Sequence, residues 1–386
     1  MRIVSVVKTN TGAEWAFRQS LWLCKHGVEV ITILPFKSGG MAEQYISAGM
    51  KVVEFDMSLP VNNPFLFLAR RAAIKEMINK LKPDIIHSHF VTNILMLRFA
   101  LGKTSSIPRI FQVPGPLHLE HIFYRKLDIL TSGAADYWIG SCKKTCDIYK
   151  TEGVSSNRVF LSYYGSYQRK WQELSGDGRL RKQFKIEKNV ILVSLVAYIY
   201  KPKKYLMQFK GIKGHEDFIE AIRLVKTKYP NVVGLIIGGP WGKSVSYEKK
   251  LRDLAFRKCG QNIIFTGYRN DVNIIYREID IAVFPSHSEN LGGAAESLCF
   301  CVPTIATNIG GFPDIVIDEK TGKLVPPNSP KDIAQAICSF IENPVEAKKM
   351  AERGRQLVAK MLDIENTAQT VFNVYQEIMQ QQGHQQ

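Results

Sequence analysis

The sequence predicts an α/β protein of two successive doubly wound domains, each a parallel sheet with helices on both faces. Short apolar runs of strand length alternate with longer amphipathic segments along most of the chain, as in repeated βαβ units. The alternation decays once, in the polar and glycine-containing stretch 163–188, and then starts again. The chain has 386 residues, which is enough for two or three domains.

The first half is expected to form a domain over residues 1–175. Its expected strands are short apolar runs, at 3–7, 28–34, 52–55, 85–88, 110–113, 137–141 and 159–161. Its expected helices carry apolar residues at helical spacing, at 14–26, 41–48, 64–81 and 122–134. Because helices separate the strands, the sheet is expected to be parallel.

The second alternation is expected to form a domain over residues 189–362. Its expected strands are 190–196, 232–238, 263–266, 279–284, 304–306 and 322–325. Its expected helices are 215–228, 247–258, 271–277, 294–300, 312–316 and 330–342. The two domains are expected to face each other across a cleft, with ligands outside the carboxyl ends of the strands.

The C-terminal region 344–380 has apolar residues at helical spacing and is expected to break near Asp363. The segment 363–380 is then expected to cross back and pack on the first domain. The polar tail 380–386 is expected to be disordered.

The net charge is +16, and residues 1–188 hold 27 Lys and Arg against 15 Asp and Glu, a net charge of +12. A basic half suggests an anionic partner, such as a membrane surface, a phosphorylated substrate or nucleic acid. A solvated basic surface without a partner is the alternative. Because the basic residues are not interleaved with aromatic ones, no nucleic-acid partner is expected.

Seven cysteines are present, and the pairs Cys142/Cys146 and Cys299/Cys301 do not have the spacing of a zinc site. We expect free thiols in a reducing compartment. The first residues indicate a strand rather than a signal peptide, and no apolar run is long enough to span a membrane. The expected location is the cytoplasm, with peripheral attachment to the inner face of the membrane left open.

Two glutamates seven positions apart, Glu289 and Glu296, flank a turn that contains Gly292 and Gly293. An expected strand ends before this turn and an expected helix follows it. Such a junction presents unpaired backbone N–H groups, which can bind a phosphate or a sugar hydroxyl. The carboxylates can accept hydrogen bonds from sugar hydroxyls. The alternative is an ordinary helix start, where acidic residues are favoured.

Three further βα junctions contain glycine, around Gly12, Lys213 and Gly239. Lys213, between Ile212 and Gly214, can neutralise a diphosphate whose oxygens bind N–H groups; a solvent-facing lysine is the alternative. Gly12 and Gly239 allow close approach of a ligand, and a plain turn is the alternative at both. The Gly12 loop lacks the GxGxxG pattern of dinucleotide-binding proteins.

A loop fixed by two prolines places His118 after the expected strand 110–113. There His118 can donate to a sugar hydroxyl or a phosphate; a structural histidine is the alternative. His87 and His89 share one side of a strand, but no third metal ligand accompanies them, so a structural role is favoured. No Asp-x-Asp triplet occurs, and no metal site is expected.

These segments together resemble the retaining nucleotide-sugar glycosyltransferases of the GT-B fold, family four, also called glycosyl transferases group 1. The resemblance is most specific from Phe284-Pro-Ser through the glutamate pair to Gly310-Gly-Phe-Pro-Asp314, and continues in Thr321-Gly-Lys. Lys213-Gly-His, Gly12-Ala-Glu14 and Pro83-Asp-Ile-Ile-His87 also match. The family implies two Rossmann-like domains, an acceptor on the first and a nucleotide-sugar on the second.

The resemblance also implies a role for each candidate residue. Glu289 would contact the hydroxyls of the transferred sugar, and His118 would lie near the reacting sugar, so that Lys213, Glu289 and His118 are the candidate catalytic residues. The other donor contacts would be the N–H groups of Asn290, Leu291, Gly292 and Gly293, the Glu296 carboxylate at the ribose, and the turns at Gly12, Gly239 and Tyr268, the last beside the base. Neither a cofactor nor a metal is expected.

Two features depart from the family. The two glutamates are seven residues apart where the family usually has eight, so the intervening turn is expected to be tighter. The family also usually has an arginine shortly before the lysine, where this chain reads Val196-Ala-Tyr198. One of Lys201, Lys203, Lys204 or Lys210 is expected to supply that charge.

The predicted activity is transfer of a hexosyl or N-acetylhexosaminyl group, with retention, from a nucleoside-diphosphate sugar to a hydroxyl group. A UDP-sugar is the expected donor. The expected acceptor is a glycan or a polyprenyl-linked glycan in bacterial surface polysaccharide synthesis. The alternatives are a nucleotide-sugar epimerase or hydrolase of the same fold, and a basic binding protein without activity.

Overall fold

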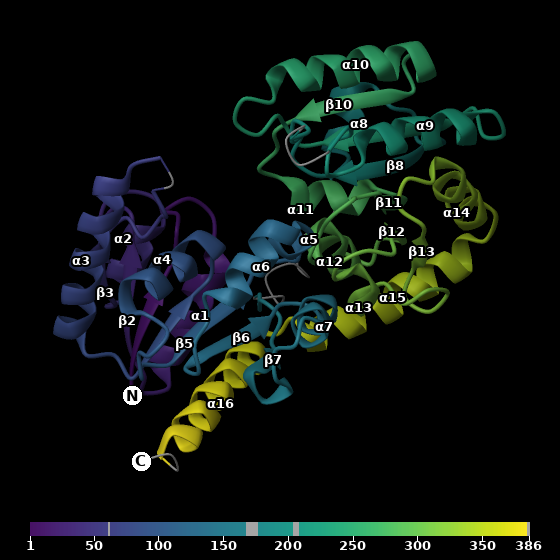
Figure 1. Ribbon diagram of the computed structural model, residues 1–386. Coiled ribbons are helices and arrows are strands. Elements are labelled where there is room, and N and C mark those ends of the chain that lie inside the picture. The colour runs from purple at the N-terminus through teal and green to yellow at the C-terminus, as the bar shows by residue number, and fades with distance from the viewer. Residues whose placement is uncertain (61, 167–176, 204–207, 384–386) are drawn as a thin grey trace. The chain divides into compact units, whose positions relative to one another are not determined.

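The computed structural model describes residues 1–60, 62–166, 177–203 and 208–383 (Figure 1). The chain divides into two compact units, Met1–Tyr167 with Met361–Gln386, and Gln168–Lys360. Each unit contains one parallel sheet with helices packed against it. The predicted fold class, two doubly wound α/β units, is therefore confirmed.

The first unit is built on a seven-stranded parallel sheet of order β3-β2-β1-β4-β5-β6-β7. Its strands are β1 (Arg2–Val6), β2 (Glu29–Leu34), β3 (Lys51–Glu54), β4 (Ile85–Ser88), β5 (Arg109–Val113), β6 (Asp136–Gly140) and β7 (Val159–Leu161). Its helices are α1 (Glu14–Lys25), α2 (Met41–Ser47), α3 (Pro64–Leu81), α4 (Val91–Leu101), α5 (Leu117–Glu120), α6 (Ile122–Leu130), α7 (Lys143–Thr151) and α16 (Ile364–Gly383). The strand order reverses at β1, which pairs with both β2 and β4.

The C-terminal helix α16 belongs to the first unit, as predicted. Its apolar face joins residues of α1 and of β1, β4, β5 and β6 in one core. Trp22 Nε1 donates a hydrogen bond of 2.5 Å to Glu365, and the buried Tyr375 hydroxyl bonds His87 Nδ1. The helix continues to Gly383, so the prediction of disorder from residue 380 was wrong for 380–383; residues 384–386 lie outside the described part.

The second unit is built on a six-stranded parallel sheet of order β10-β9-β8-β11-β12-β13. Its strands are β8 (Ile191–Val196), β9 (Val232–Ile237), β10 (Ile263–Gly267), β11 (Ile281–Phe284), β12 (Thr304–Thr307) and β13 (Lys323–Val325). Its helices are α8 (Arg179–Phe184), α9 (His215–Lys226), α10 (Val245–Cys259), α11 (Val272–Ile275), α12 (Gly292–Cys299), α13 (Phe312–Ile315), α14 (Pro330–Glu342) and α15 (Pro344–Met361). Here the order reverses at β8, between β9 and β11.

Four of the observed helices were not predicted from the sequence: α4, α5, α7 and α8. Most residues of α4 are buried, so the helix is apolar nearly all round and lacks the one-sided pattern of a surface helix. The short helix α8 lies in the stretch expected to be a linker. It is part of the second unit, because Glu278 accepts hydrogen bonds from the backbone N–H groups of Leu180 and Arg181.

The division into units changes the assignment of charge. The first unit has 20 Lys and Arg against 15 Asp and Glu, a net charge of +5, whereas the second has 31 against 20, or +11. The reason is that the basic segment 168–188 belongs to the second unit, while residues 361–386 bring carboxylates and no Lys or Arg to the first. The expectation that the N-terminal domain carries most of the positive charge was therefore wrong.

Candidate functional site

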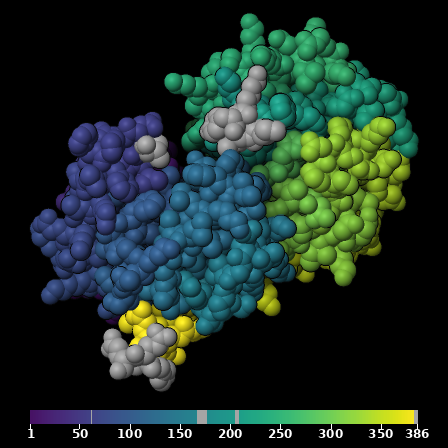
Figure 2. All heavy atoms as spheres, in the orientation of Figure 1, coloured from purple at the N-terminus to yellow at the C-terminus, as the bar shows by residue number. Residues whose placement is uncertain are grey.

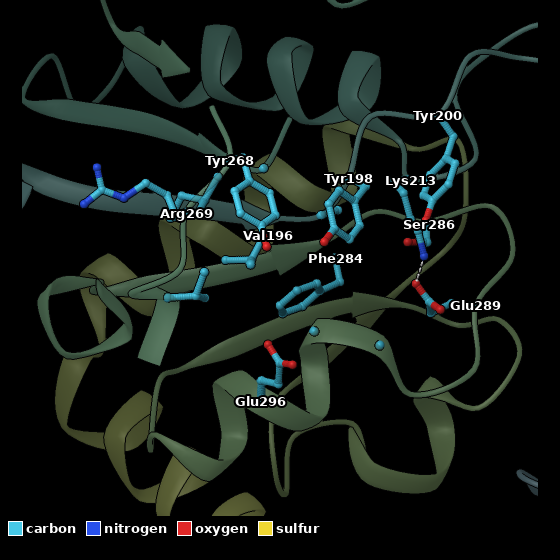
Figure 3. Close-up of a pocket in the computed structure, with 16 residues that line it drawn as sticks. Val196, Tyr198, Tyr200, Lys213, Tyr268, Arg269, Phe284, Ser286, Glu289 and Glu296 are labelled. Atoms are coloured by element: carbon cyan, nitrogen blue, oxygen red, sulfur yellow. Dashed lines mark hydrogen bonds and ion pairs between the residues drawn. The ribbon is translucent and has the colours of Figure 1, made fainter. Parts of the chain in front are cut away.

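A pocket of about 380 Å³ opens in the second unit at the carboxyl ends of β8, β9, β10 and β11. It therefore lies where the strand order reverses, the usual ligand position in a doubly wound sheet. Figure 3 shows Lys213, Tyr200 and Glu289 at one end, Tyr268 and Arg269 at the other, and Glu296 on one side between them.

The start of α12 forms one wall of the pocket. Gly292 and Gly293 are its first residues, and no side chain caps it. A Cβ atom on Gly293 would lie 2.6 Å from Phe284 Cε1, and one on Gly292 would lie 2.7 Å from Glu289 Cδ. Larger residues are thus excluded, and the first N–H groups of the helix face a cavity at the positive end of its dipole. This wall can bind phosphate oxygens.

Lys213 and Glu289 form an ion pair at one end of the pocket. Their side chains are 19% and 15% exposed. The backbone of Glu289 is fixed as well, since its carbonyl accepts a hydrogen bond of 3.3 Å from Gly311 N–H. The Gly310-Gly311 turn singled out in the sequence therefore positions this glutamate. A ligand here meets a cation and a carboxylate side by side.

Glu296 projects from α12 into the pocket (Figure 3). Its side chain stays open to the cavity, yet protein atoms surround it closely enough that desolvation raises its pKa to about 7. In the described part of the chain, no Lys or Arg pairs with it. An unpaired carboxylate in a partly dry pocket is suited to accept hydrogen bonds from paired hydroxyls, such as those of a ribose.

Aromatic side chains line the opposite wall. The rings of Tyr198 and Tyr268 are 6.2 Å apart and nearly parallel, at 21°, and Trp241 packs edge-on against Tyr198 at 4.9 Å. The exposed ring of Tyr268 is placed to stack on a flat ligand. Tyr268 was predicted from the sequence, whereas Tyr198 and Tyr200 were not; their position directly after β8 was the available signal.

The structure brings together six of the sequence-predicted residues: Lys213, Tyr268, Glu289, Gly292, Gly293 and Glu296. The remaining donor candidates of this unit lie beside the pocket. Gly239 packs against Tyr268, the Asn290 N–H donates to Glu289 Oε1 at 3.1 Å, and Leu291 is buried. Their roles in binding stay predictions.

Gly12 and His118 lie in the first unit, so neither lines this pocket. Gly12 has φ of 72° in the turn before α1. His118 Nε2 is 3.4 Å from Asp128 Oδ2 and 3.3 Å from the Tyr149 hydroxyl. Asp128 is buried, and the Arg98 guanidinium 2.6 Å away helps to hold its pKa at about 2, against desolvation. One nitrogen of His118 thus faces an internal network, and a catalytic role stays a prediction.

Of the lysines expected to supply the charge of the missing arginine, Lys210 pairs with the buried Asp217 at 2.6 Å. Lys201 and Lys203 are not among the pocket-lining residues, and Lys204 lies outside the described residues. Among the described residues, Arg269 also lines the pocket as a cation, held by two hydrogen bonds to Asp271, of 2.8 and 2.7 Å.

Within the described ranges, no group of three or more His, Cys, Asp or Glu side chains is arranged to hold a metal ion. Likewise, none of the helices in these ranges is long and apolar enough to cross a membrane.

Two known protein families match this chain. Residues 204–357 match the family "Glycosyl transferases group 1", and residues 9–116 match "Glycosyl transferase 4-like". The two matches together cover more than half of the chain and include Lys213, Glu289 and Glu296. The region that holds Lys213, Glu289 and Glu296 thus belongs to the group 1 glycosyl transferases. The resemblance inferred from the sequence is confirmed.

Curated relatives match over part of their length. A D-inositol 3-phosphate glycosyltransferase of Saccharomonospora viridis is 31% identical over 153 residues, 38% of this chain and 35% of that protein. The lipopolysaccharide core biosynthesis mannosyltransferase LpsB of Rhizobium meliloti is 24% identical over 171 residues, 43% of this chain and 49% of that protein. The chain thus spans between a third and a half of the length of these relatives.

Solved structures of similar fold cover nearly the whole chain. Anabaena HepE in complex with UDP-glucose has a TM-score of 0.79 at 16% identity, over 97% of this chain and 98% of that one. A glycosyltransferase of Rickettsia africae has a TM-score of 0.78 at 19% identity, over 98% of both chains. At this identity the likeness shows the fold, which is that of the GT-B glycosyltransferases.

Proposed function

We propose that this group 1 family member transfers a hexosyl or N-acetylhexosaminyl group from a nucleoside-diphosphate sugar to a hydroxyl group, with retention of configuration. The observation that carries the proposal is the pocket of the second unit. From one end to the other it holds the Glu289 carboxylate, Lys213 with the glycine-rich start of α12, the unpaired Glu296 carboxylate and the exposed ring of Tyr268. This order matches the sugar, diphosphate, ribose and base of one nucleotide-sugar.

A UDP-sugar is the proposed donor. Support comes from HepE, a protein of the same fold that has been solved with UDP and with UDP-glucose. In this proposal Glu289 accepts hydrogen bonds from the sugar hydroxyls, Lys213 and the N–H groups at Gly292 and Gly293 bind the diphosphate, and Glu296 holds the ribose. The base lies beside Tyr268.

The chemistry of the step follows from charge. When the bond between the sugar and the diphosphate breaks, negative charge develops on the leaving phosphate oxygen. Lys213 and the helix N-terminus are fixed in place to stabilise that charge, and fixed donors contribute strongly to catalysis in a cavity that excludes water. We propose that these groups suffice without a metal ion.

The proposed acceptor is a glycan or a lipid-linked glycan. Relatives named for lipopolysaccharide core and capsular polysaccharide biosynthesis support this class of acceptor. We propose a cytoplasmic location, with peripheral attachment at the inner face of the membrane.

The test is a donor screen that follows nucleotide release by mass spectrometry, with and without a glycan acceptor. Release that requires the acceptor supports transfer, whereas conversion of the donor alone indicates an epimerase or a hydrolase. Glu289→Ala and Lys213→Ala should each lower turnover at least tenfold. Glu342→Ala removes a surface glutamate that also pairs with a lysine and serves as the control. Undiminished turnover in both pocket variants would refute the site.

A further inference from the structure

Helix α3 exposes apolar side chains that are not buried against the rest of its unit. Only Ile74 and Ile78 of this helix are buried. Its first two turns nevertheless hold Phe65, Leu66 and Leu68 with their side chains in solvent, at 84%, 43% and 57% exposure. In a helix that covers a sheet, apolar residues are expected on the inner side alone.

The tip of α3 stands at the carboxyl edge of the first sheet, because the helix follows the end of β3. The loop after β2 reaches the same edge and exposes Phe36 at 62%. The loop after β2 contacts the end of β3, since the Lys37 N–H donates to Glu54 Oε2 at 3.1 Å. We call Phe36, Phe65, Leu66 and Leu68 the apolar rim. In Figure 1, α3 runs along the outer side of its unit, and the indigo atoms of this part of the chain are open to solvent in Figure 2.

Cations accompany the rim. Lys37, Arg71 and Lys75 are exposed, and none has an ion-pair partner among the described residues. Of the nearby carboxylates, Asp56 pairs with Arg70 at 2.9 Å and Glu76 with Lys80 at 2.6 Å, which leaves Glu54 against the three unpaired cations. The local charge available to a partner is therefore positive, even though the unit as a whole has a net charge of only +5.

We propose that the apolar rim docks on the interface of an anionic lipid bilayer. Aromatic and leucine side chains insert at the boundary between headgroups and acyl chains, while neighbouring Lys and Arg side chains bind anionic headgroups. The rim and these cations supply both parts. Docking at this edge brings the carboxyl ends of the first sheet, where a ligand of a doubly wound unit binds, to the membrane surface. The rim assigns residues to the peripheral attachment proposed above. A lipid-linked acceptor would then meet the enzyme there, a step that rests on the proposed transferase activity, whereas binding of the rim to a bilayer is measured without it.

The test measures binding of the full chain to vesicles of phosphatidylcholine alone and with 30% phosphatidylglycerol, by flotation, at about 0.1 M salt. The unmodified protein should float with the anionic vesicles. Phe65→Ser/Leu68→Ser should weaken binding at least tenfold, and Arg71→Glu should weaken it at low salt but little at high salt. Leu130→Ser is the matched control, because Leu130 is 66% exposed in the same unit but lies at the end of α6.

Three flotation results would overturn the proposal: no flotation of the unmodified protein, equal flotation of the double variant, or an equal loss in Leu130→Ser. Sedimentation velocity tests whether a second copy of the chain binds the rim instead. A dimer that the double variant dissociates would make the rim an interface between copies of the chain and would overturn the proposal. Transfer to a water-soluble glycan should be unchanged in the double variant, so a failure of docking is distinguishable from a failure of the proposed function.

Discussion

Replacing Lys213 by methionine should weaken UDP binding strongly while leaving the chain folded. Lys213 and Glu289 form an ion pair at one end of the pocket, with 19% and 15% of their side chains exposed. A charge-assisted hydrogen bond contributes about 1.5–3 kcal/mol, so loss of the lysine should cost about 2 kcal/mol of UDP binding, or roughly 30-fold in Kd. The unpaired Glu289 carboxylate would also repel the diphosphate, so the loss of binding free energy should lie toward the upper end of the range of about 1.5–3 kcal/mol.

A double-mutant cycle separates these two contributions. Glu289→Gln in the Lys213→Met background removes the repelling charge and should recover part of the lost affinity. The coupling between the two positions should be about 0.5–3 kcal/mol, as for other contacting pairs. Titration calorimetry with UDP alone measures each corner, and thermal unfolding monitors the fold.

Lys228→Met is the control, because Lys228 pairs with Glu342 on the surface at 2.5 Å and lies outside the pocket. Its UDP affinity should stay within twofold of that of the unmodified protein. The reasoning is refuted if Lys213→Met also binds UDP within twofold, or if the cycle shows no coupling between positions 213 and 289.

Three further predictions concern the pocket and the core. Gly293→Ala should cost about 1–3 kcal/mol of stability and weaken UDP binding, because its Cβ would lie 2.6 Å from Phe284 Cε1; urea unfolding and calorimetry check both, and an unchanged Kd would contradict the close approach. The pKa of Glu296 is raised to about 7 from about 4.3 in an unfolded chain, so its contribution to stability is present below pH 4.3 and is lost as the pH rises to 7. Glu296→Gln should therefore have a higher Tm than the unmodified protein at pH 8 but not at pH 4. A difference in Tm that is the same at both pH values would be inconsistent with the raised pKa. Tyr375→Phe leaves His87 Nδ1 without its partner in a buried site and should lower the free energy of unfolding by about 1–3 kcal/mol, which chemical denaturation measures; no loss would argue against the docking of α16.

Local patterns in the sequence predicted the parts of the fold and site that depend on neighbouring residues. The strand 85–88 and the helix 64–81 were placed at their observed ends, since each has a clear period and a clear stop. The glutamate pair could be recognised because the strand, the glycine turn and the helix start are contiguous. The helix after the turn, α12, begins at Gly292, two residues before the expected start.

What depends on distant residues could not be predicted. The pairing of Lys213 with Glu289 joins positions 76 apart in the chain and requires β8 and β11 to be neighbours. The stacking of Tyr198 near Tyr268 likewise depends on the sheet order, so Tyr198 was read as part of a family departure rather than as a wall of the pocket. The net charge of each unit could be counted only once the residues of each unit were known, because α16 adds carboxylates to the first unit.

A crystal structure of the chain with UDP-glucose would show whether the pocket of the second unit holds a nucleoside-diphosphate sugar. The diphosphate should lie against the first N–H groups of α12 and Lys213, the ribose at Glu296 and the base beside Tyr268. A nucleotide bound elsewhere, or a reversed orientation with the base at Lys213 and Glu289, would contradict this prediction.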